Sequence, residues 1–353
     1  MDLSIVIPAY SPEKFLGNLF ARLEVIDKKF VELNLSSELI FLHNGSTSAL
    51  AEKIPKLHAI KFKYHEFRER LTPALARNIG INQSVGRFVL FHDVDDLLNL
   101  EFPEAFHKLK RFLLLDVASY DLIVFRYRKI KQDGVEVIGH GLKETNFELK
   151  ARDLESYINR YIQKPHVFTL FVHCWSKLYS RSFLLKHELA FHPKLEQLED
   201  VNFNFRVLNK SPKIYYCGAV CYDYTVATGS SNLSAESGAK GAVDIRSTVK
   251  ALLPAKEYLQ NSIKKRAGVR RQIGHLYATT FVLWLIRTTR RLQGTSKFSE
   301  IVAEYVKSRA VQGSMRHYKY LLGTSWVIPC LVVCKMNKLL TIVLCKQFGG
   351  RQQ

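Results

Sequence analysis

The order of apolar and amphipathic segments in the first hundred residues is the strongest constraint on the fold. Four short apolar runs have the length of buried strands, and they lie at Leu3–Pro8, Glu38–Leu42, 58–64 and Arg87–His92. The segments between them are expected to be helical, at Pro12–Ile26, 48–54 and Pro73–Gln83. This βαβαβαβ order predicts a mostly parallel sheet covered by helices, with ligands bound at the carboxyl ends of the strands.

Two polar turns follow predicted strands, at His43-Asn44-Gly45-Ser46 and at Asp93-Val94-Asp95-Asp96. The second turn places three carboxylates within four positions, where they repel one another unless they share a cation. Hard oxygen ligands of this kind suit Mg²⁺ or Mn²⁺. The alternative is an acidic helix N-terminus, with Asp95 or Asp96 as its cap. The tetrapeptide alone leaves both interpretations open.

Two further groups of charged residues could belong to the same site. Arg77, in Ala76-Arg77-Asn78-Ile79-Gly80, lies on a predicted helix and could pair with phosphate oxygens. Taken alone, it is equally an exposed arginine on a solvated helix face. Glu199 and Asp200 precede a predicted helix, where an acidic pair is favoured by the helix dipole whether or not it has a function.

The rest of the chain changes character near Ser237. Before that point we expect strands at 121–128, 174–179 and 213–224, a hairpin at Gln132-Asp133-Gly134, and helices at 152–162 and 199–209. Beyond it we expect helices only. The apolar stretch Leu276–Ile286 is too short to span a bilayer.

The positive charge is concentrated in this last part. The whole chain has a net charge of +20, and residues 246–353 hold 20 Lys or Arg against three Glu. Such a surplus predicts an anionic partner: acidic lipid headgroups, nucleic acid or a phosphorylated acceptor.

Segment Trp326–Lys346 is expected to form one helix lying in the plane of a membrane surface. On a helical wheel, its apolar face holds Leu339, Val332, Val343, Met336, Leu340, Val333 and Leu344. Lys335, Lys338 and Lys346 group together on another face.

The N-terminus and the cysteines bear on the compartment. Met1-Asp2 runs directly into a predicted strand, so no secretory signal is expected. The six cysteines form no CxxC pair and have no zinc spacing, which predicts buried, reduced thiols in a cytoplasmic protein.

An ordered set of motifs resembles the family 2 glycosyltransferases, which have the nucleotide-sugar-binding (GT-A) fold. The resemblance covers roughly the first two-thirds of the chain and includes relatives that decorate bacterial capsule, lipopolysaccharide and wall teichoic acid. Its motifs are Ser4-Ile5-Val6-Ile7-Pro8-Ala9-Tyr10, Gly45-Ser46, Ala76-Arg77-Asn78-Ile79-Gly80, Gly86–Asp96, Trp175–Arg181, Phe191, Leu198-Glu199-Asp200-Val201, Phe203, Tyr222, Tyr224 and Ser230–Ser234.

The resemblance implies a role for each matching residue. Pro8 and Tyr10 would lie against the nucleotide base, and Arg77 would contact the diphosphate. Asp93 would approach the ribose, while Asp95 would hold the Mn²⁺ or Mg²⁺ that bridges the two phosphates. Asp200 would be the general base of a single, inverting displacement.

Three further positions are expected to contact substrate. Lys177 and Trp175 would line the sugar pocket, with core packing as an equal alternative for Trp175; Glu199 would lie beside the base.

The first polar turn departs from the family, because His43-Asn44 stands where Asp-Asp is usual. Asn44 can accept a hydrogen bond from uracil N3–H or donate one to cytosine N3. The resemblance implies UDP, and the change to Asn44 weakens that inference, so UDP is the expected nucleotide with CDP and GDP as alternatives. His43 could pack as a neutral ring under the base, and His92 is interpreted as satisfied within the core.

We therefore expect a catalytic domain at 1–235, with a nucleotide-sugar half at 1–128 and an acceptor half at 129–235, followed by a basic helical region at 236–353. The acceptor would be a surface-polysaccharide or lipid-linked glycan at the inner face of the cytoplasmic membrane. The C-terminal helices could also mediate self-association.

Three rival functions fit less well. A nucleotidyltransferase would need a Gly-rich phosphate loop after the first strand, where Pro8-Ala9-Tyr10 stands instead. No nucleic-acid-binding motif accompanies the basic residues, so no nucleic acid is expected. An inactive scaffold of the same fold is suggested only by the change at His43-Asn44.

Overall fold

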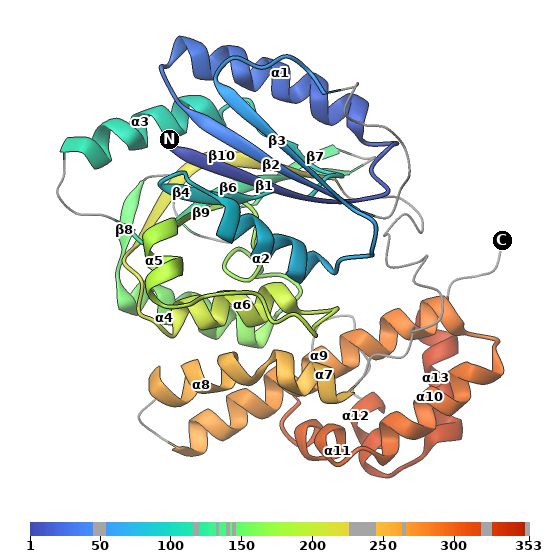
Figure 1. The fold of residues 1–353 in the computed structure, drawn as a ribbon. Helices are drawn as coiled ribbons and strands as arrows, with labels where there is room; N and C mark the ends of the chain where they lie inside the picture. Colours follow the sequence, from blue (N-terminus) through green and yellow to red (C-terminus); the bar gives the residue numbers. More distant parts are fainter. Residues whose placement is uncertain are drawn as a thin grey trace. The chain divides into compact units, whose positions relative to one another are not determined.

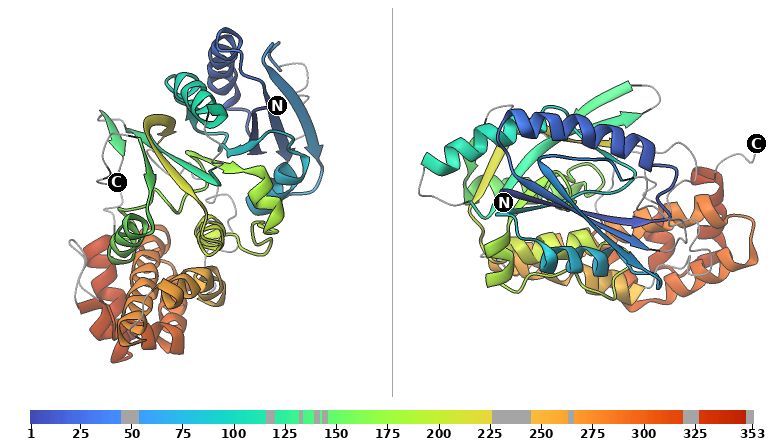
Figure 2. Two further views of the ribbon diagram at one scale, coloured as in Figure 1. Left: turned by 90° about the vertical axis from the view of Figure 1, so that its left-hand side faces the viewer. Right: turned by 45° about the horizontal axis from the view of Figure 1, so that its top comes forward.

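The computed structural model describes residues 1–44, 54–115, 120–131, 134–138, 142, 146–225, 245–262, 266–318 and 327–349. The chain divides into two compact units (Figures 1 and 2). The first comprises 1–150 and 170–231, and the second comprises 151–169 and 232–353. Segment 151–169, which lies within the expected catalytic domain, thus belongs to the second unit. The predicted helix at 48–54 and the motifs Gly45-Ser46 and Ser230–Ser234 lie almost entirely outside the described residues.

The first unit is built on a sheet with the strand order β3-β2-β1-β4-β9-β6-β10-β5, while β7 pairs with β6 and β8 with β10. The strands are β1 Leu3–Tyr10, β2 Ser37–Asn44, β3 Ile60–Phe67, β4 Phe88–Phe91, β5 Leu97–Leu98, β6 Leu122–Lys131, β7 Gly134–Ile138, β8 Phe147–Leu149, β9 Lys177–Ser180 and β10 Ile214–Thr225. β1 to β4 are parallel, β10 is parallel to β6, and β9 runs antiparallel between β4 and β6. The predicted α/β fold with a mostly parallel sheet is confirmed.

Helices cover both faces of this sheet. α1 and α3 lie on one side, and α2, α5 and α6 lie on the other (Figures 1 and 2). Their bounds are α1 Leu16–Glu32, α2 Pro73–Gln83, α3 Phe102–Leu115, α5 Arg181–Lys186 and α6 Glu199–Leu208. The sequence interpretation missed α3 and the short strands β5 and β8, and it placed the third strand about two residues too early.

Helix α2 is fixed at its start and along its length. Thr72 accepts a hydrogen bond from the Leu75 N–H, and Pro73 occupies the first turn, where its missing N–H costs nothing. Gly80 faces β1 so closely that a Cβ there would lie 2.2 Å from Val6 Cγ1. This close packing holds Arg77, one turn earlier, beside the carboxyl ends of the strands.

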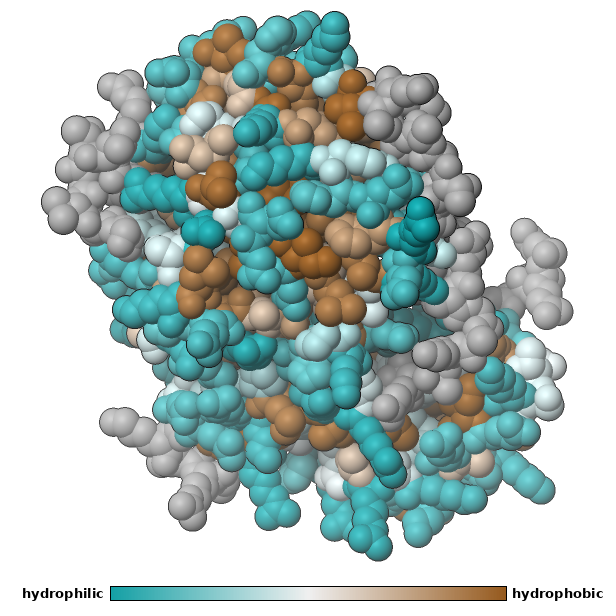
Figure 3. Space-filling model, viewed as in Figure 1, coloured by the Kyte–Doolittle hydropathy of each residue, from teal (hydrophilic) through white to brown (hydrophobic). Residues whose placement is uncertain are grey.

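The second unit is helical throughout its described part, as predicted. Its helices are α4 Ala151–Gln163, α7 Ile245–Ala251, α8 Leu253–Ser262, α9 Arg266–Leu292, α10 Ser296–Lys307, α11 Arg309–Met315, α12 Val327–Val333 and α13 Asn337–Phe348. One apolar core joins α9 to α13, with Phe281, Val302, Val311, Val332 and Leu340 among its buried members. In the view of Figure 3, hydrophilic side chains predominate over the surface of these helices.

The prediction of one continuous helix at Trp326–Lys346 is wrong. α12 ends at Val333, Lys335 has a left-handed φ of 57°, and α13 begins at Asn337. The break turns part of the predicted membrane face inward, so that Val332, Leu340 and Leu344 pack in the core of the unit. None of the helices in the described part of the chain is both long and apolar enough to cross a bilayer.

The cysteines correct a second expectation. Cys174, Cys217 and Cys221 are buried free thiols, as predicted, but Cys330 and Cys334 are exposed. Both exposed thiols lie on α12 or directly after it, where their side chains face solvent because the core occupies the other side of the helix.

Candidate functional site

The carboxyl ends of β1 and β2 lie side by side and present the residues expected at the nucleotide base. Tyr10 pairs in register with Asn44, and Pro8 pairs with Leu42. Pro8 and Tyr10 are half-buried, and the Arg70 guanidinium lies 4.7 Å from the centre of the Tyr10 ring. Asn44 is only 2% exposed, and its buried Oδ1 has no hydrogen-bond partner among the residues that the structure describes.

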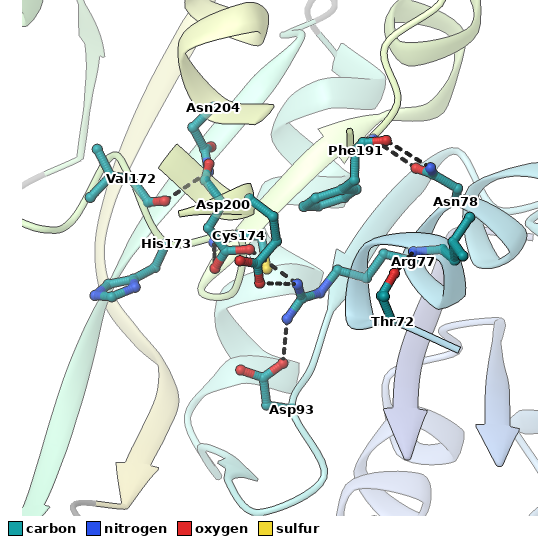
Figure 4. Close-up of polar contacts among 12 residues, drawn as sticks. Thr72, Arg77, Asn78, Asp93, Val172, His173, Cys174, Phe191, Asp200 and Asn204 are labelled. Carbon is teal, nitrogen blue, oxygen red and sulfur yellow. Dashed lines mark hydrogen bonds and ion pairs between the residues drawn. The ribbon is translucent and has the colours of Figure 1, made fainter. Parts of the chain in front are cut away.

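Arg77 is the centre of the charged cluster (Figure 4). Its Nη2 donates to Asp93 at 2.9 Å, and its Nη1 donates to Glu199 and to Asp200, each at 3.1 Å. The three carboxylates come from the loop after β4 and from the first turn of α6. One buried guanidinium on α2 therefore brings together four of the residues that the sequence singled out.

Local structure fixes the direction of the acidic pair. Leu198 has a left-handed φ of 58°, which ends the preceding loop and starts α6 at Glu199. Both carboxylates occupy the first turn, where the helix dipole favours negative charge. Asp200 Oδ2 also accepts the Cys174 backbone N–H at 3.2 Å. The two interpretations of this pair, helix start and functional carboxylates, are thus compatible.

The cluster carries more negative than positive charge, since three carboxylates face one arginine. Burial and the neighbouring Asp200 raise the pKa of Glu199, Arg77 opposes them, and the result is a pKa of about 7. The pKa of Arg77 is raised, because the surrounding carboxylates outweigh the cost of its burial. Glu199 is therefore able to hold a proton near neutral pH.

The Asp93-Val94-Asp95-Asp96 turn separates its three carboxylates. Asp96 is buried, accepts hydrogen bonds from the Tyr222 hydroxyl at 2.9 Å and from the Thr225 N–H at 2.8 Å, and has a pKa raised well above its usual value by burial. Asp95 is exposed. Asp96 therefore supports the turn, and Asp93 and Asp95 are the two carboxylates of this turn left to contact a cation.

Asp93 and Asp95 could hold a cation only if a bound substrate supplied further ligands. Within the described ranges, no three His, Cys, Asp or Glu side chains gather closely enough to hold a metal ion by themselves. The surrounding protein and the nearby Asp93 raise the pKa of Asp95, a repulsion that a divalent ion would relieve. Asp95, with Asp93 close by, matches Mg²⁺ or Mn²⁺ sites in which phosphate oxygens supply further ligands.

Trp175 and Lys177 do not line an open pocket. Trp175 is 4% exposed and stacks on His173 and Tyr222, with ring centroids 4.4 and 4.7 Å away, which supports the packing interpretation. Lys177 is 1% exposed, and its Nζ donates to the carbonyls of His173 at 2.5 Å and Trp175 at 3.4 Å. Burial lowers the pKa of Lys177 to about 7. The expected direct substrate contact by Lys177 does not fit this position.

His43 and His92 are both buried packing residues. His43 Nδ1 lies 2.7 Å from the Tyr64 hydroxyl, within the sheet. His92 packs edge-on against Tyr222, and burial lowers its pKa to about 4. Its expected place within the core is correct, because the ring is buried.

Sequence reasoning assigned no role to two residues that support the site. The Tyr222 hydroxyl accepts the Asp93 N–H at 3.0 Å while donating to Asp96, so it anchors both ends of the acidic turn. Asn78 bonds both the carbonyl and the N–H of Phe191, whose ring faces the Arg77 guanidinium at 5.3 Å. Both residues lie within the motifs of the family resemblance, and this was the only indication in the sequence that they support the site.

Comparison with known proteins places this geometry in a family. The model for "Glycosyl transferase family 2" matches residues 4–182. The glycosyltransferase GlyA of Streptococcus pneumoniae is 26% identical over 77% of this chain and 37% of its own length. The poly(ribitol-phosphate) β-N-acetylglucosaminyltransferase TarS of Staphylococcus aureus is 24% identical over 66% of this chain and 37% of its own length. The chain thus spans well under half the length of both curated relatives.

Solved structures share the fold. Residues 1–349 of Staphylococcus aureus TarS, in complex with UDP-GlcNAc, superpose with a TM-score of 0.64 at 17% identity, covering 100% of this chain and 93% of that one. The same protein with UDP gives a TM-score of 0.61 at 16% identity, with the same coverage. The family model, which matches half of the chain, shows that the chain belongs to glycosyl transferase family 2.

Proposed function

We propose that the chain transfers a sugar from a UDP-sugar to a hydroxyl of a surface-polysaccharide or lipid-linked glycan acceptor, with inversion at the anomeric carbon. The observation that carries the proposal is the set of hydrogen bonds from Arg77 to Asp93 and to Asp200. Arg77 therefore contacts both Asp93, the carboxylate assigned to the donor, and Asp200, the carboxylate assigned to the acceptor.

The uridine assignment rests on the carboxyl ends of β1 and β2. Tyr10 offers a half-buried ring for stacking against a base, and the unpartnered Oδ1 of Asn44 lies beside it in register. A buried acceptor without a partner is costly and favours a ligand that donates. Uracil N3–H donates, whereas cytosine N3 accepts, so Asn44 favours UDP over CDP. TarS, which has the same fold, binds UDP and UDP-GlcNAc, and UDP-GlcNAc is the first donor to test.

Asp200 is the proposed general base. Its carboxylate would accept the proton of the acceptor hydroxyl as that oxygen attacks the anomeric carbon opposite the departing UDP. Arg77 currently bonds Asp200 Oδ1, and a diphosphate is a stronger partner for a guanidinium because its charge is larger. Donor binding would therefore draw Arg77 toward the phosphates and free Asp200 to meet the hydroxyl.

Asp95 is the proposed protein ligand of Mn²⁺ or Mg²⁺, with Asp93 beside it. A bound divalent ion would supply positive charge against the departing diphosphate. The chain's own contribution is the placement of Asp95 at an exposed position on a turn that Tyr222 and Asp96 hold rigid.

We further propose that the second unit docks the enzyme on the inner face of the cytoplasmic membrane. Met336, Leu339 and Ile342, on one face of α13 and the residue before it, are exposed by 46%, 42% and 51%. Lys335 and Lys338 are exposed among them, and no acidic residue follows Glu304 in the sequence. Apolar side chains flanked by lysines suit an anionic bilayer. We call Lys335, Met336, Lys338, Leu339 and Ile342 the α13 edge.

Thermal unfolding with UDP, CDP and GDP, each with Mn²⁺, with Mg²⁺ and with chelator, tests the donor site. A ligand at 100 times its dissociation constant stabilises the folded state by about 2.7 kcal/mol. We expect a metal-dependent shift with UDP that exceeds those with CDP and GDP. Transfer from UDP-GlcNAc to a glycan acceptor then tests catalysis; no shift with any nucleotide would instead favour an inactive scaffold.

A further inference from the structure

Lys177 is unusual because a lysine ammonium is buried without a carboxylate partner among the described residues. It is the first residue of β9, between β4 and β6, and its side chain is 1% exposed. Burying an ammonium is costly unless hydrogen bonds compensate for lost water. The two bonds that compensate here go to backbone carbonyls, those of His173 and Trp175.

These two carbonyls belong to the residues on either side of Cys174. The Cys174 N–H donates to Asp200 Oδ2 at 3.2 Å. The 173–175 segment lies outside the strands, and it is followed by Ser176, which has a left-handed φ of 56°. Ser176 is tied to β6, because its Oγ donates to the Arg126 carbonyl at 3.1 Å. Lys177 thus forms hydrogen bonds with an irregular segment on both sides of Cys174, whose N–H binds Asp200.

We infer that Lys177 is a positioning residue for the base: its ammonium fixes the two carbonyls around Cys174, so that the Cys174 N–H holds Asp200 in place. This inference rests on the proposed function of Asp200. Figure 4 shows the Asp200 carboxylate bonded to Arg77, a contact that would be lost when the diphosphate draws Arg77 away; the Cys174 N–H donates to the same carboxylate. The Cys174 N–H does not depend on the donor, so it remains during the displacement.

A positioning role for Lys177 has different measurable effects from a donor contact or from simple packing. A donor contact would affect the affinity for UDP. A residue that only packs would affect the free energy of unfolding but leave turnover per folded molecule unchanged. A positioning residue affects kcat while donor affinity is kept, because a misplaced base lowers the rate without touching the nucleotide.

The test compares Lys177→Met with Lys63→Met. Methionine has nearly the length of lysine but cannot donate to the carbonyls. Lys63 is also partly buried in this sheet, but it pairs with Glu38 at 2.6 Å and belongs to β3, away from the Asp200 cluster. We expect Lys177→Met to lower kcat by roughly 10- to 100-fold, with the Kd for UDP within about twofold of wild type. Lys63→Met should leave kcat per folded molecule unchanged.

Amide hydrogen exchange provides a readout that does not require turnover. Exchange of the Cys174 N–H should become faster in Lys177→Met and stay unchanged in Lys63→Met. If Lys177→Met does not fold, Lys177→Leu, which also cannot donate to the carbonyls, takes its place in both measurements. Unchanged kcat or unchanged Cys174 exchange in a folded variant would overturn the inference, and a matched loss of UDP affinity would make Lys177 a donor contact instead. If the wild type transfers no sugar, the proposed function fails, while exchange still decides whether Lys177 holds the segment.

Discussion

Arg77 and Asp200 are 123 positions apart in the sequence, yet Arg77 Nη1 donates to Asp200 Oδ1 across 3.1 Å. The same guanidinium binds Asp93, so one side chain links the loop after β4 with the start of α6. This link is both structural and functional: it neutralises buried carboxylates, and it occupies the position from which a cation would contact a diphosphate.

Replacing Arg77 should therefore damage stability and donor binding together. Arg77→Ala would leave Asp93, Glu199 and Asp200 without their shared partner, and we expect the free energy of unfolding to fall by about 3–5 kcal/mol. Arg77→Lys keeps the charge but cannot donate to three carboxylates from a planar fork, so it should recover part of the stability and little of the UDP affinity. Urea unfolding and calorimetric titration with UDP measure the two effects; an alanine variant as stable as wild type would contradict the structural role.

Asp200→Asn tests the base. We expect kcat to fall by about 10²–10⁴, since asparagine cannot take the hydroxyl proton, while the Kd for UDP changes little. Glu199→Gln, one residue earlier in the same turn, is the matched control and should retain much more activity. If Asp200→Asn loses UDP affinity to the same extent as activity, Asp200 acts in donor binding instead.

Local patterns predicted the individual residues of the site but not how they meet. The strands and the polar turns at their ends follow from apolar runs, and the resemblance singled out Arg77, Asp93 and Asp200. The bonds from Arg77 to Glu199 and Asp200 depend on how α2 and α6 pack over the same face of the sheet, which no pattern along the chain encodes.

Directions of side chains were harder to predict than positions. Trp175 and Lys177 have the chemistry of a sugar pocket, but both are buried, Lys177 at the start of β9 and Trp175 two residues before it. The helical wheel for 326–346 assumed one straight helix, and a single left-handed residue, Lys335, invalidated it. In both cases tertiary packing decided which face of a segment meets solvent.

The raised pKa of Glu199 predicts a pH dependence of stability. Its pKa is about 7 in the folded protein against 4.5 ordinarily, so between these values the folded state binds more protons than the unfolded state. The contribution of Glu199 to stability is therefore present at pH 5 and is lost as pH rises toward 7, by up to about 1.4 kcal/mol per pH unit. Glu199→Gln, which is neutral throughout, should gain stability relative to wild type between pH 5 and pH 8.

Urea unfolding at pH 5, 6, 7 and 8 measures this difference, and Glu24→Gln, at an exposed position on α1, is the control. A Glu199→Gln variant whose stability parallels that of wild type across the whole range would show that Glu199 is not protonated in the folded protein.

Asp95 and Asp96 are adjacent but should respond oppositely to substitution. Asp95 is exposed, so Asp95→Ala should fold normally and lose the effect of Mn²⁺ on the UDP-induced thermal shift. Asp96→Ala leaves the Tyr222 hydroxyl and the Thr225 N–H without their acceptor, which costs about 1–3 kcal/mol for each group. Thermal unfolding of both variants with UDP, with and without Mn²⁺, separates the roles. A full metal effect in Asp95→Ala would remove Asp95 as a ligand.

The α13 edge gives the membrane proposal a sharper test than truncation would. Removing the C-terminal segment would also remove Val332, Leu340 and Leu344 from the core of the second unit, and loss of binding could then reflect unfolding. Substitutions at exposed positions avoid this problem. We expect Met336→Ser, Leu339→Ser and Ile342→Ser together to abolish sedimentation with anionic liposomes while leaving the melting temperature nearly unchanged.

The charge can be tested separately from the apolar contacts. Lys335→Gln with Lys338→Gln removes about 1 kcal/mol of attraction per lysine near an anionic surface, so binding should weaken roughly 30-fold and lose much of its salt dependence. Val25→Ser with Val31→Ser, at exposed positions on α1, is the control and should bind like wild type. An exposed apolar face could also bind a second copy of the chain. Size-exclusion chromatography of the same variants tests this alternative. If the serine variant changes oligomeric state but still sediments with liposomes, the α13 edge is a contact between copies and not a membrane surface.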